Sequence, residues 1–166
     1  MTANVLWRGM AAGDLASVSG IAAMVHPAFP EDDAVFAERL ALHPAGCRLL
    51  VVAGEPAGYV ISHPWRSGSL PALNALLGSL PGDADVYYIH DLALLPAARG
   101  TGAGAAAVLA LKRHALSLGF TALSLVAVNN SAAFWTRQGF GETPSGAVAE
   151  KLASYGDDAR LMACPL

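Results

Sequence analysis

Apolar residues return along this chain with two spacings, which predict different secondary structures. Recurrence every three or four positions is typical of a helix that buries one face, and strict alternation is typical of a strand. The wider spacing predicts helices over residues 14–25, 32–42, 103–118 and 131–138. In the longest of these, Ala107, Leu111, Ala115 and Leu118 fall on one helical face, which we expect to be buried.

Short runs rich in β-branched and aromatic residues predict the strands. They cover residues 4–9, 48–53, 59–62, 86–94, 122–128 and 161–166. The Gly-Glu-Pro-Ala-Gly segment at 54–58 has turn chemistry, so the runs on either side of it are predicted to pair as an antiparallel hairpin. Residues 122–128 are apolar on both alternating faces, as expected for a central strand that is covered on both sides.

The composition adds one alternative, a membrane protein, because 54% of the residues are hydrophobic and only 14% are charged. The longest stretch without charged residues, 114–136, is interrupted by Gly, Asn, Ser and Thr, so it does not predict a spanning helix. The N-terminus has no basic region followed by an apolar block, and no signal peptide is predicted. We therefore expect a cytoplasmic protein whose 166 residues form a single domain, 1–166.

Charge and cysteine content exclude several classes of partner. The formal net charge is −3, and Lys and Arg are scattered rather than grouped, so nucleic acid is not an expected partner. Without a secretion signal, Cys47 and Cys164 are predicted to be reduced core thiols, and neither belongs to a metal-spaced cluster. No metal is expected.

A glycine-rich turn, Arg99-Gly100-Thr101-Gly102-Ala103-Gly104, joins a predicted strand to the longest predicted helix. Unpaired N–H groups at a helix start, free of obstructing side chains, favour binding of a phosphate group. A Walker A loop would need Gly-Lys-Ser/Thr, which is missing. A dinucleotide fingerprint would need an acidic residue about 20 positions on, whereas the first one is Glu142. The remaining interpretation is Arg-x-x-Gly-x-Gly, a pyrophosphate-binding turn.

Two segments then carry a family resemblance. HDLALLPAARGTGAG (90–104) resembles the central motif of the GNAT acetyltransferase superfamily, and VNNSAAFWTRQGF (128–140) resembles its following strand-to-helix segment. The resemblance implies an α/β fold with a mixed, mostly antiparallel sheet of six to seven strands, flanked by about four helices and splayed at the CoA site. It also implies acetyl-CoA as co-substrate. Backbone groups of Leu92, Ala93 and Leu94 would bind its pantetheine arm, the turn Arg99–Gly104 its pyrophosphate, and Asn129, Ser131 and Phe134 would flank it.

Acetyl transfer to an amine needs a neutral amine, so a proton acceptor is required. His90 is the first candidate, because an imidazole can accept a proton at neutral pH. Alternation along the strand would place Tyr88, His90, Leu92 and Leu94 on one face. Tyr88 is the second catalytic candidate, whereas Asp91 would lie on the opposite face and anchor a neighbouring helix or a backbone amide. A structural histidine, hydrogen-bonded within the sheet, is the competing interpretation of His90.

The leaving thiolate has no obvious proton donor. Many family members carry a Tyr where this chain has Trp135, and an indole N–H is not a general acid at physiological pH. Ser131, Tyr155 or solvent would have to serve, unless the thiolate leaves unassisted. Trp135 itself is predicted to pack in the core beneath the CoA arm.

The acceptor side is predicted from two segments. Glu31, Asp32 and Asp33 form either an acidic rim that attracts a cationic amine or a solvated helix start. The insertion 62–82 is predicted to contain an amphipathic helix that walls the acceptor pocket. His63, Pro64 and Trp65 open it, as an aromatic acceptor surface or as a strand end packed on the core.

The sequence therefore predicts an acetyl-CoA-dependent N-acetyltransferase that moves acetyl to a primary amine of a small molecule or peptide, by direct attack in a ternary complex. The alternatives are a non-catalytic acyl-CoA-binding or sensor module and a nucleotide-cofactor oxidoreductase. The expected partners are acetyl-CoA and an amine acceptor, with neither nucleic acid nor membrane, and a homodimer is left open.

Overall fold

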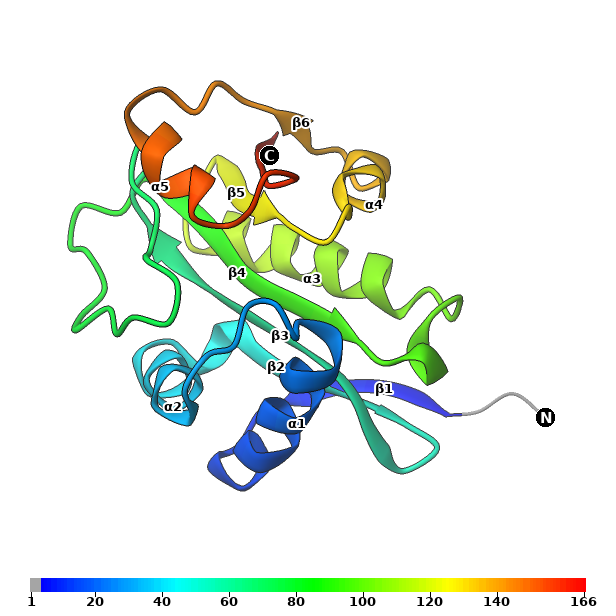
Figure 1. Cartoon of the computed structure of the whole chain (residues 1–166). Helices are drawn as coiled ribbons and strands as arrows, with labels where there is room; N and C mark the ends of the chain where they lie inside the picture. The colour runs from blue at the N-terminus through cyan, green and yellow to red at the C-terminus, as the bar shows by residue number, and fades with distance from the viewer. Residues whose placement is uncertain (1–3) are drawn as a thin grey trace.

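A single sheet of seven strands organises the chain, in the order β1-β2-β3-β4-β5-β7-β6. The computed structural model describes residues 4–166, and Figure 1 shows helices on both faces of the sheet. The strands are β1 (Val5–Gly9), β2 (Cys47–Val52), β3 (Glu55–Trp65), β4 (Val86–Leu94), β5 (Ala122–Ala127), β6 (Gly141–Glu142) and β7 (Arg160–Pro165). The helices are α1 (Leu15–Val25), α2 (Asp33–Leu42), α3 (Ala103–Ser117), α4 (Ala132–Arg137) and α5 (Ala149–Ala153).

All neighbouring strands run antiparallel except β4 and β5, which are parallel. The predicted mixed, mostly antiparallel sheet of six to seven strands is confirmed, and so is the hairpin between β2 and β3. Strand β3 runs on to Trp65, past the predicted end of that strand at residue 62. The predicted helix count of about four misses only α5, which is too short to show a periodic apolar face.

Two apolar layers hold the helices on the sheet. On one face, Val108 and Leu111 of α3 pack with Trp135 of α4 against β4, β5 and β7. On the other face, helices α1 and α2 pack through Val18, Ile21 and Phe36 against β2 and β3. The buried face of α3 includes Ala107, Leu111 and Ala115 as predicted, but Leu118 lies beyond the helix end and is 47% exposed. Both cysteines are buried and free, as predicted.

Two irregularities in the pairing of β4 shape the region of the candidate functional site. Strands β4 and β5 pair only from Tyr87 to Ile89 on β4, so beyond Ile89 they diverge, as the resemblance implied. On its other edge, β4 pairs with β3 through a register shift in which Ile61 faces Asp91 and Ser62 faces Ile89. His90 is therefore the extra residue of a β-bulge, which re-aims the side chains that follow it.

The insertion after β3 contradicts its prediction. Residues 66–85 form turns, bends and irregular segments without a helix, so the amphipathic helix predicted within 62–82 is wrong. Leu70 is buried against Tyr88 and Val148, whereas Leu76 is 60% exposed. Two prolines and three glycines within this stretch disfavour a continuous helix, since proline restricts the backbone and glycine loosens it. Within residues 4–166, no helix has both the length and the apolar character needed to cross a bilayer.

Candidate functional site

The glycine-rich turn leaves the start of α3 open to a ligand. Gly100 and Gly102 have positive φ angles of 77° and 80°, and a Cβ placed on either would meet no atom within 4 Å. Gly102 is the N-cap of α3 and has no side chain to cap the helix, while the hydroxyl of Thr101 accepts a hydrogen bond of 3.3 Å from the N–H of Ala103. The first N–H groups of a helix lack partners within it, and the helix dipole adds positive potential there. The geometry of the turn suits an anion, and binding of the CoA pyrophosphate there stays a prediction.

A large cavity of about 270 Å³ lies where β4 and β5 diverge. Six of the residues predicted to bind CoA line it, namely Leu92, Leu94, Arg99, Asn129, Ser131 and Phe134. The side chain of Ala93 is buried on the opposite face of β4, with α1 and α2, so only its backbone is available to a ligand. Gly104 lies under the ring of Phe134, which a Cβ at this position would approach to 3.2 Å. This groove joins the turn to the middle of the sheet.

A small cavity of about 40 Å³ adjoins the large one. Its own walls are Phe29, Glu31, Leu73, Tyr88 and Tyr155. Five residues line both cavities, and we call them the junction: His26, His90, Asp91, Val126 and Val128. A ligand in the groove and a ligand in the small cavity would meet there, so the junction is where chemistry between them can occur.

The first ionisable pair of the junction is His26 with Asp91. His26 lies at the C-cap of α1, and its Nε2 is 2.7 Å from Oδ1 of Asp91. The other carboxylate oxygen accepts a hydrogen bond from the hydroxyl of Tyr59 on β3. Burial lowers the pKa of His26, but the hydrogen bond and charge of Asp91 outweigh burial, so that the pKa is raised overall. Burial raises the pKa of Asp91, but the bond to His26 and the neighbouring charges leave it below its usual value.

The second pair is His90 with Glu31. Nε2 of His90 is 2.8 Å from Oε1 of Glu31, and the two side chains are only 5% and 8% exposed. Burial raises the pKa of Glu31, but the hydrogen bond and charge of His90 outweigh it and leave the pKa lowered. Of the predicted acidic rim, only Glu31 turns inward. Asp32 and Asp33 are exposed. Asp33 is the first residue of α2 and accepts a hydrogen bond from the hydroxyl of Ser19 in α1.

The β-bulge corrects the predicted arrangement of side chains along β4. Strict alternation would put Ile89 and Leu92 on opposite faces, yet both pack on the α3 side. His90 and Asp91 instead both contact residues that precede α2, namely Glu31 and His26. The prediction that Asp91 faces away from His90 is therefore wrong, because the extra residue at the bulge shifts the alternation by one position. Neither the His26–Asp91 pair nor the His90–Glu31 pair was predicted from the sequence.

Tyrosine and tryptophan side chains form the remaining walls. Tyr88 is 2% exposed and lines the small cavity, where burial raises its pKa well above the usual value. Tyr155 lines the same cavity and donates to the carbonyl of Pro71, so it lies on the far side of the junction from the groove. Trp135 packs edge-on against Phe134 and Phe140 at the base of the groove, in agreement with its predicted packing role.

Two other sequence candidates lie elsewhere. His63 and Trp65 line neither cavity and pack together at the end of β3, consistent with the strand-end interpretation. Within residues 4–166, no group of three or more side chains is arranged to hold a metal ion.

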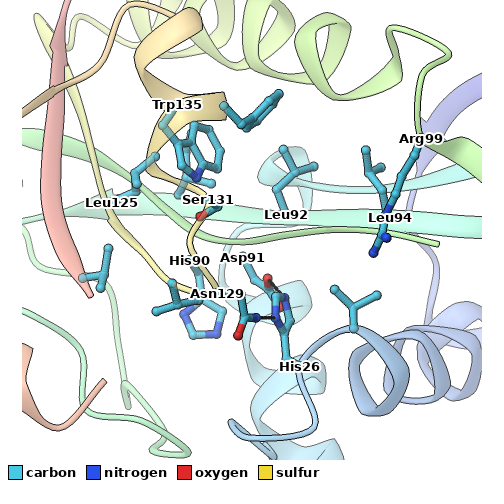
Figure 2. A pocket seen from close by; sticks show the side chains of 15 residues that line it. His26, His90, Asp91, Leu92, Leu94, Arg99, Leu125, Asn129, Ser131 and Trp135 are labelled. Atoms are coloured by element: carbon cyan, nitrogen blue, oxygen red, sulfur yellow. Dashed lines mark hydrogen bonds and ion pairs between the residues drawn. The ribbon is translucent and has the colours of Figure 1, made fainter. Parts of the chain in front are cut away.

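Sequence reasoning missed His26, which stands at the end of a helix before Pro27 and belongs to no motif. Figure 2 shows its ring beside Asn129 and Asp91, with hydrogen bonds to both. The only hint in the sequence was that His26 is a titratable residue in the connection between α1 and α2, which also contains Glu31. Tertiary contact with β4, not spacing, makes it part of the site.

Comparison with known proteins gives a family and a fold. The model of the acetyltransferase (GNAT) family matches residues 19–140. No curated protein matches the chain. Among solved structures, Ard1 from Thermoplasma volcanium is 18% identical with a TM-score of 0.74, covering 98% of this chain and 97% of its own. Arabidopsis thaliana Naa50, bound to the bisubstrate analogue CoA-Ac-MVNAL, is 18% identical with a TM-score of 0.68, covering 96% and 97%. At such identities the similarity shows the fold alone.

Proposed function

The chain belongs to the acetyltransferase (GNAT) family, and from this premise we propose that it transfers acetyl from acetyl-CoA to a primary amine in a ternary complex. The observation that carries the proposal is the junction, where a groove from an anion-binding turn meets a second cavity at two His–carboxylate pairs. Direct transfer needs donor and acceptor to be held together, and two adjoining cavities provide that.

The donor side of the proposal rests on the groove. The pyrophosphate of CoA would lie on the N–H groups of the turn Arg99–Gly104, beside the exposed guanidinium of Arg99. The pantetheine arm would follow the divergent edge of β4 at Leu92, Ala93 and Leu94. Asn129, Ser131 and Phe134 line the opposite wall. Backbone groups at the divergence lack a strand partner, so an amide-containing arm can pair with them.

The acceptor side rests on the small cavity. Its walls combine the carboxylates of Glu31 and Asp91, each bonded to a histidine of the junction, with aromatic and aliphatic side chains, and no Lys or Arg lines it. A cationic amine attached to an apolar group suits such a pocket, because the carboxylates attract the ammonium. Ard1 and Naa50 are similar in fold, and the analogue bound to Naa50 joins CoA to a peptide, which is consistent with a peptide or small-molecule amine.

Within the junction, His90 is the proposed proton acceptor, with Glu31 holding its Nε2. Tyr88 is proposed as a wall of the acceptor pocket beside it, since a phenol that stays protonated can donate a hydrogen bond but not accept the amine proton. Trp135 offers no acidic group to the thiolate. Its place at the base of the groove leaves Ser131 or solvent to protonate the departing sulfur.

A direct assay tests the proposal. The protein is incubated with acetyl-CoA and a panel of amines, including peptides with free N-termini and apolar monoamines, while thiol release and product mass are measured. We expect thiol release that depends on the amine, with acetylated amine as product. CoA binding with no acetyl transfer to any amine would instead indicate a binding module. Thermal stabilisation by NAD and not by CoA would contradict the proposed donor.

A further inference from the structure

Amide formation from an alkyl ammonium requires two proton losses at the same nitrogen. The ammonium must lose one proton before its lone pair can attack the acetyl carbonyl. After the C–N bond has formed, the nitrogen must lose a second proton as the C–S bond breaks. A single proton acceptor can take both protons only if it releases the first one before the second is lost. Two acceptors beside the same nitrogen can instead take one proton each.

His26 lies at the same point as His90, because both line the large and the small cavity. Their hydrogen bonds go to different carboxylates, His26 to Asp91 and His90 to Glu31, so the two imidazoles do not share a partner. His26 is also the more accessible, with its side chain 14% exposed against 5% for His90. A proton taken by His26 can therefore return to solvent more easily.

The hydrogen bonds of His26 define its tautomer. The carboxylate of Asp91 only accepts, so the proton of a neutral His26 lies on Nε2, which donates to Asp91. Nδ1 then carries a lone pair, and it lies 2.8 Å from Nδ2 of the exposed Asn129. An amide turned by 180° about its last bond would present its oxygen instead, and would accept from a protonated Nδ1. Asn129 can thus satisfy both protonation states of the ring.

The surroundings of His26 suit an imidazolium. Asp91 is fixed from its other side by the hydroxyl of Tyr59, which holds the carboxylate against the ring. The charged and titratable groups that line the two cavities with His26 are Asp91 and His90 on β4, Glu31 in the connection before α2, Arg99 of the turn, and the phenols of Tyr88 and Tyr155. Two carboxylates therefore offset the charge that His26 would gain, as in other His–Asp pairs that accept protons.

We propose that His26, held by Asp91, is a second catalytic proton acceptor of the acetyl transfer, alongside His90. This inference rests on the proposed function. The amine nitrogen forms the C–N bond, the C–S electron pair leaves with sulfur as CoA thiolate, and one of the two nitrogen protons passes to Nδ1 of His26. In this step the amine takes the place of Asn129 as the hydrogen-bond partner of Nδ1 of His26. The products are the acetylated amine and CoA, with the protons shared between sulfur and solvent.

The experiment uses an amine that the wild-type protein has been shown to acetylate, so that a loss reports on His26 and not on the proposed function. His26→Gln keeps an amide able to hydrogen-bond Asp91 but cannot take a proton. The turnover number, its pH profile and the affinity for CoA are measured for this variant and for His43→Gln. His43 is a half-buried histidine that bonds Tyr87 and His114 and lines neither cavity. A His26→Ala variant is assayed with added imidazole.

We expect His26→Gln to lower turnover by about 100-fold or more while CoA affinity stays within about threefold, because acid–base catalysis contributes on that scale. The acid limb of the pH profile should change, His43→Gln should turn over like the wild type, and imidazole should restore part of the activity of His26→Ala. Turnover of His26→Gln within about threefold of the wild type would overturn the inference. Equal losses of turnover and CoA affinity, with no rescue by imidazole, would also overturn it, since they indicate a structural role.

Discussion

Nε2 of His26 lies 2.7 Å from Oδ1 of Asp91, although 65 residues separate them in the chain. The contact joins the end of α1 to the bulged part of β4. It fixes the connection between α1 and α2 over the junction, and with it the position of Glu31 opposite His90. The pair thus links the packing of the first helix to the shape of the small cavity.

Replacing Asp91 by Asn should destabilise the protein in a pH-dependent way. The pKa of His26 is raised in the folded state, so its contribution is present below about pH 6.5, the ordinary value, and is lost as pH rises through the folded pKa. The pKa of Asp91 is lowered, so its contribution is lost only as pH falls through the folded pKa. We expect Asp91→Asn to cost about 2 kcal/mol near pH 5.5 and less at pH 9, by urea unfolding. An equal cost at both pH values would contradict the ion pair.

Replacing His90 by Gln should lower turnover by about 100-fold without weakening CoA binding, because the variant lacks the proposed proton acceptor at the junction. Steady-state kinetics and calorimetric titration with CoA measure the two effects. His114→Gln, on the other side of the sheet with Tyr87, is the matched control and should turn over like the wild type. Unchanged turnover in His90→Gln would remove His90 from the reaction.

Replacing Gly102 by Val should abolish measurable CoA binding. Its φ of 80° is unfavourable for Val, and the new side chain would fill the open space where the pyrophosphate is proposed to lie. Gly119→Val is the matched control, because Gly119 follows the other end of α3 with a φ of 88° and equally open surroundings. Both variants should lose about 1–2 kcal/mol of stability from backbone strain, but only Gly102→Val should lose CoA in a titration. Loss of CoA binding in both would assign the effect to strain.

Replacing His63 by Leu should make the protein less sensitive to acid. Burial lowers the pKa of His63 to about 3, so between that value and the ordinary one, the unfolded chain binds a proton that the folded protein does not. Stability is therefore lost as pH falls, at about 1.4 kcal/mol per pH unit from this residue. The free energy of unfolding of His63→Leu, relative to wild type, should rise by about that slope from pH 6 to pH 4. A difference that does not depend on pH would contradict a neutral buried imidazole.

Replacing Tyr155 by Phe should loosen the wall of the small cavity. Its hydroxyl donates to the carbonyl of Pro71 in the segment after β3, so its removal should cost about 1–2 kcal/mol and raise the KM for the amine. Tyr87→Phe is the control, since that buried hydroxyl bonds Ser62 across the sheet at 2.9 Å and lines neither cavity. It should cost similar stability without changing KM, and an equal change of KM in both variants would argue against a wall role for Tyr155.

Local patterns determined most of the fold. The spacing of apolar residues, the turn residues and the Arg99–Gly104 motif predicted every strand longer than two residues and the glycine-rich turn before α3, because those features depend on neighbours in sequence. They failed over residues 66–85, where leucines at helical spacing are set by contacts such as that of Leu70 with Tyr88. The spacing of apolar residues in the sequence does not show which distant residues their side chains will contact in the folded chain.

The chemistry of the junction was decided only by tertiary structure. The sequence pointed to His90, but it placed Asp91 on the wrong face and passed over His26, because one extra residue at a bulge reverses the alternation after it. Folding α1 and α2 onto that face then brings His26 to Asp91 and Glu31 to His90, across 65 and 59 residues. The sequence by itself determined where CoA is expected to bind, through a continuous motif. Which ionisable groups meet at its end depends on packing between segments that the chain keeps far apart.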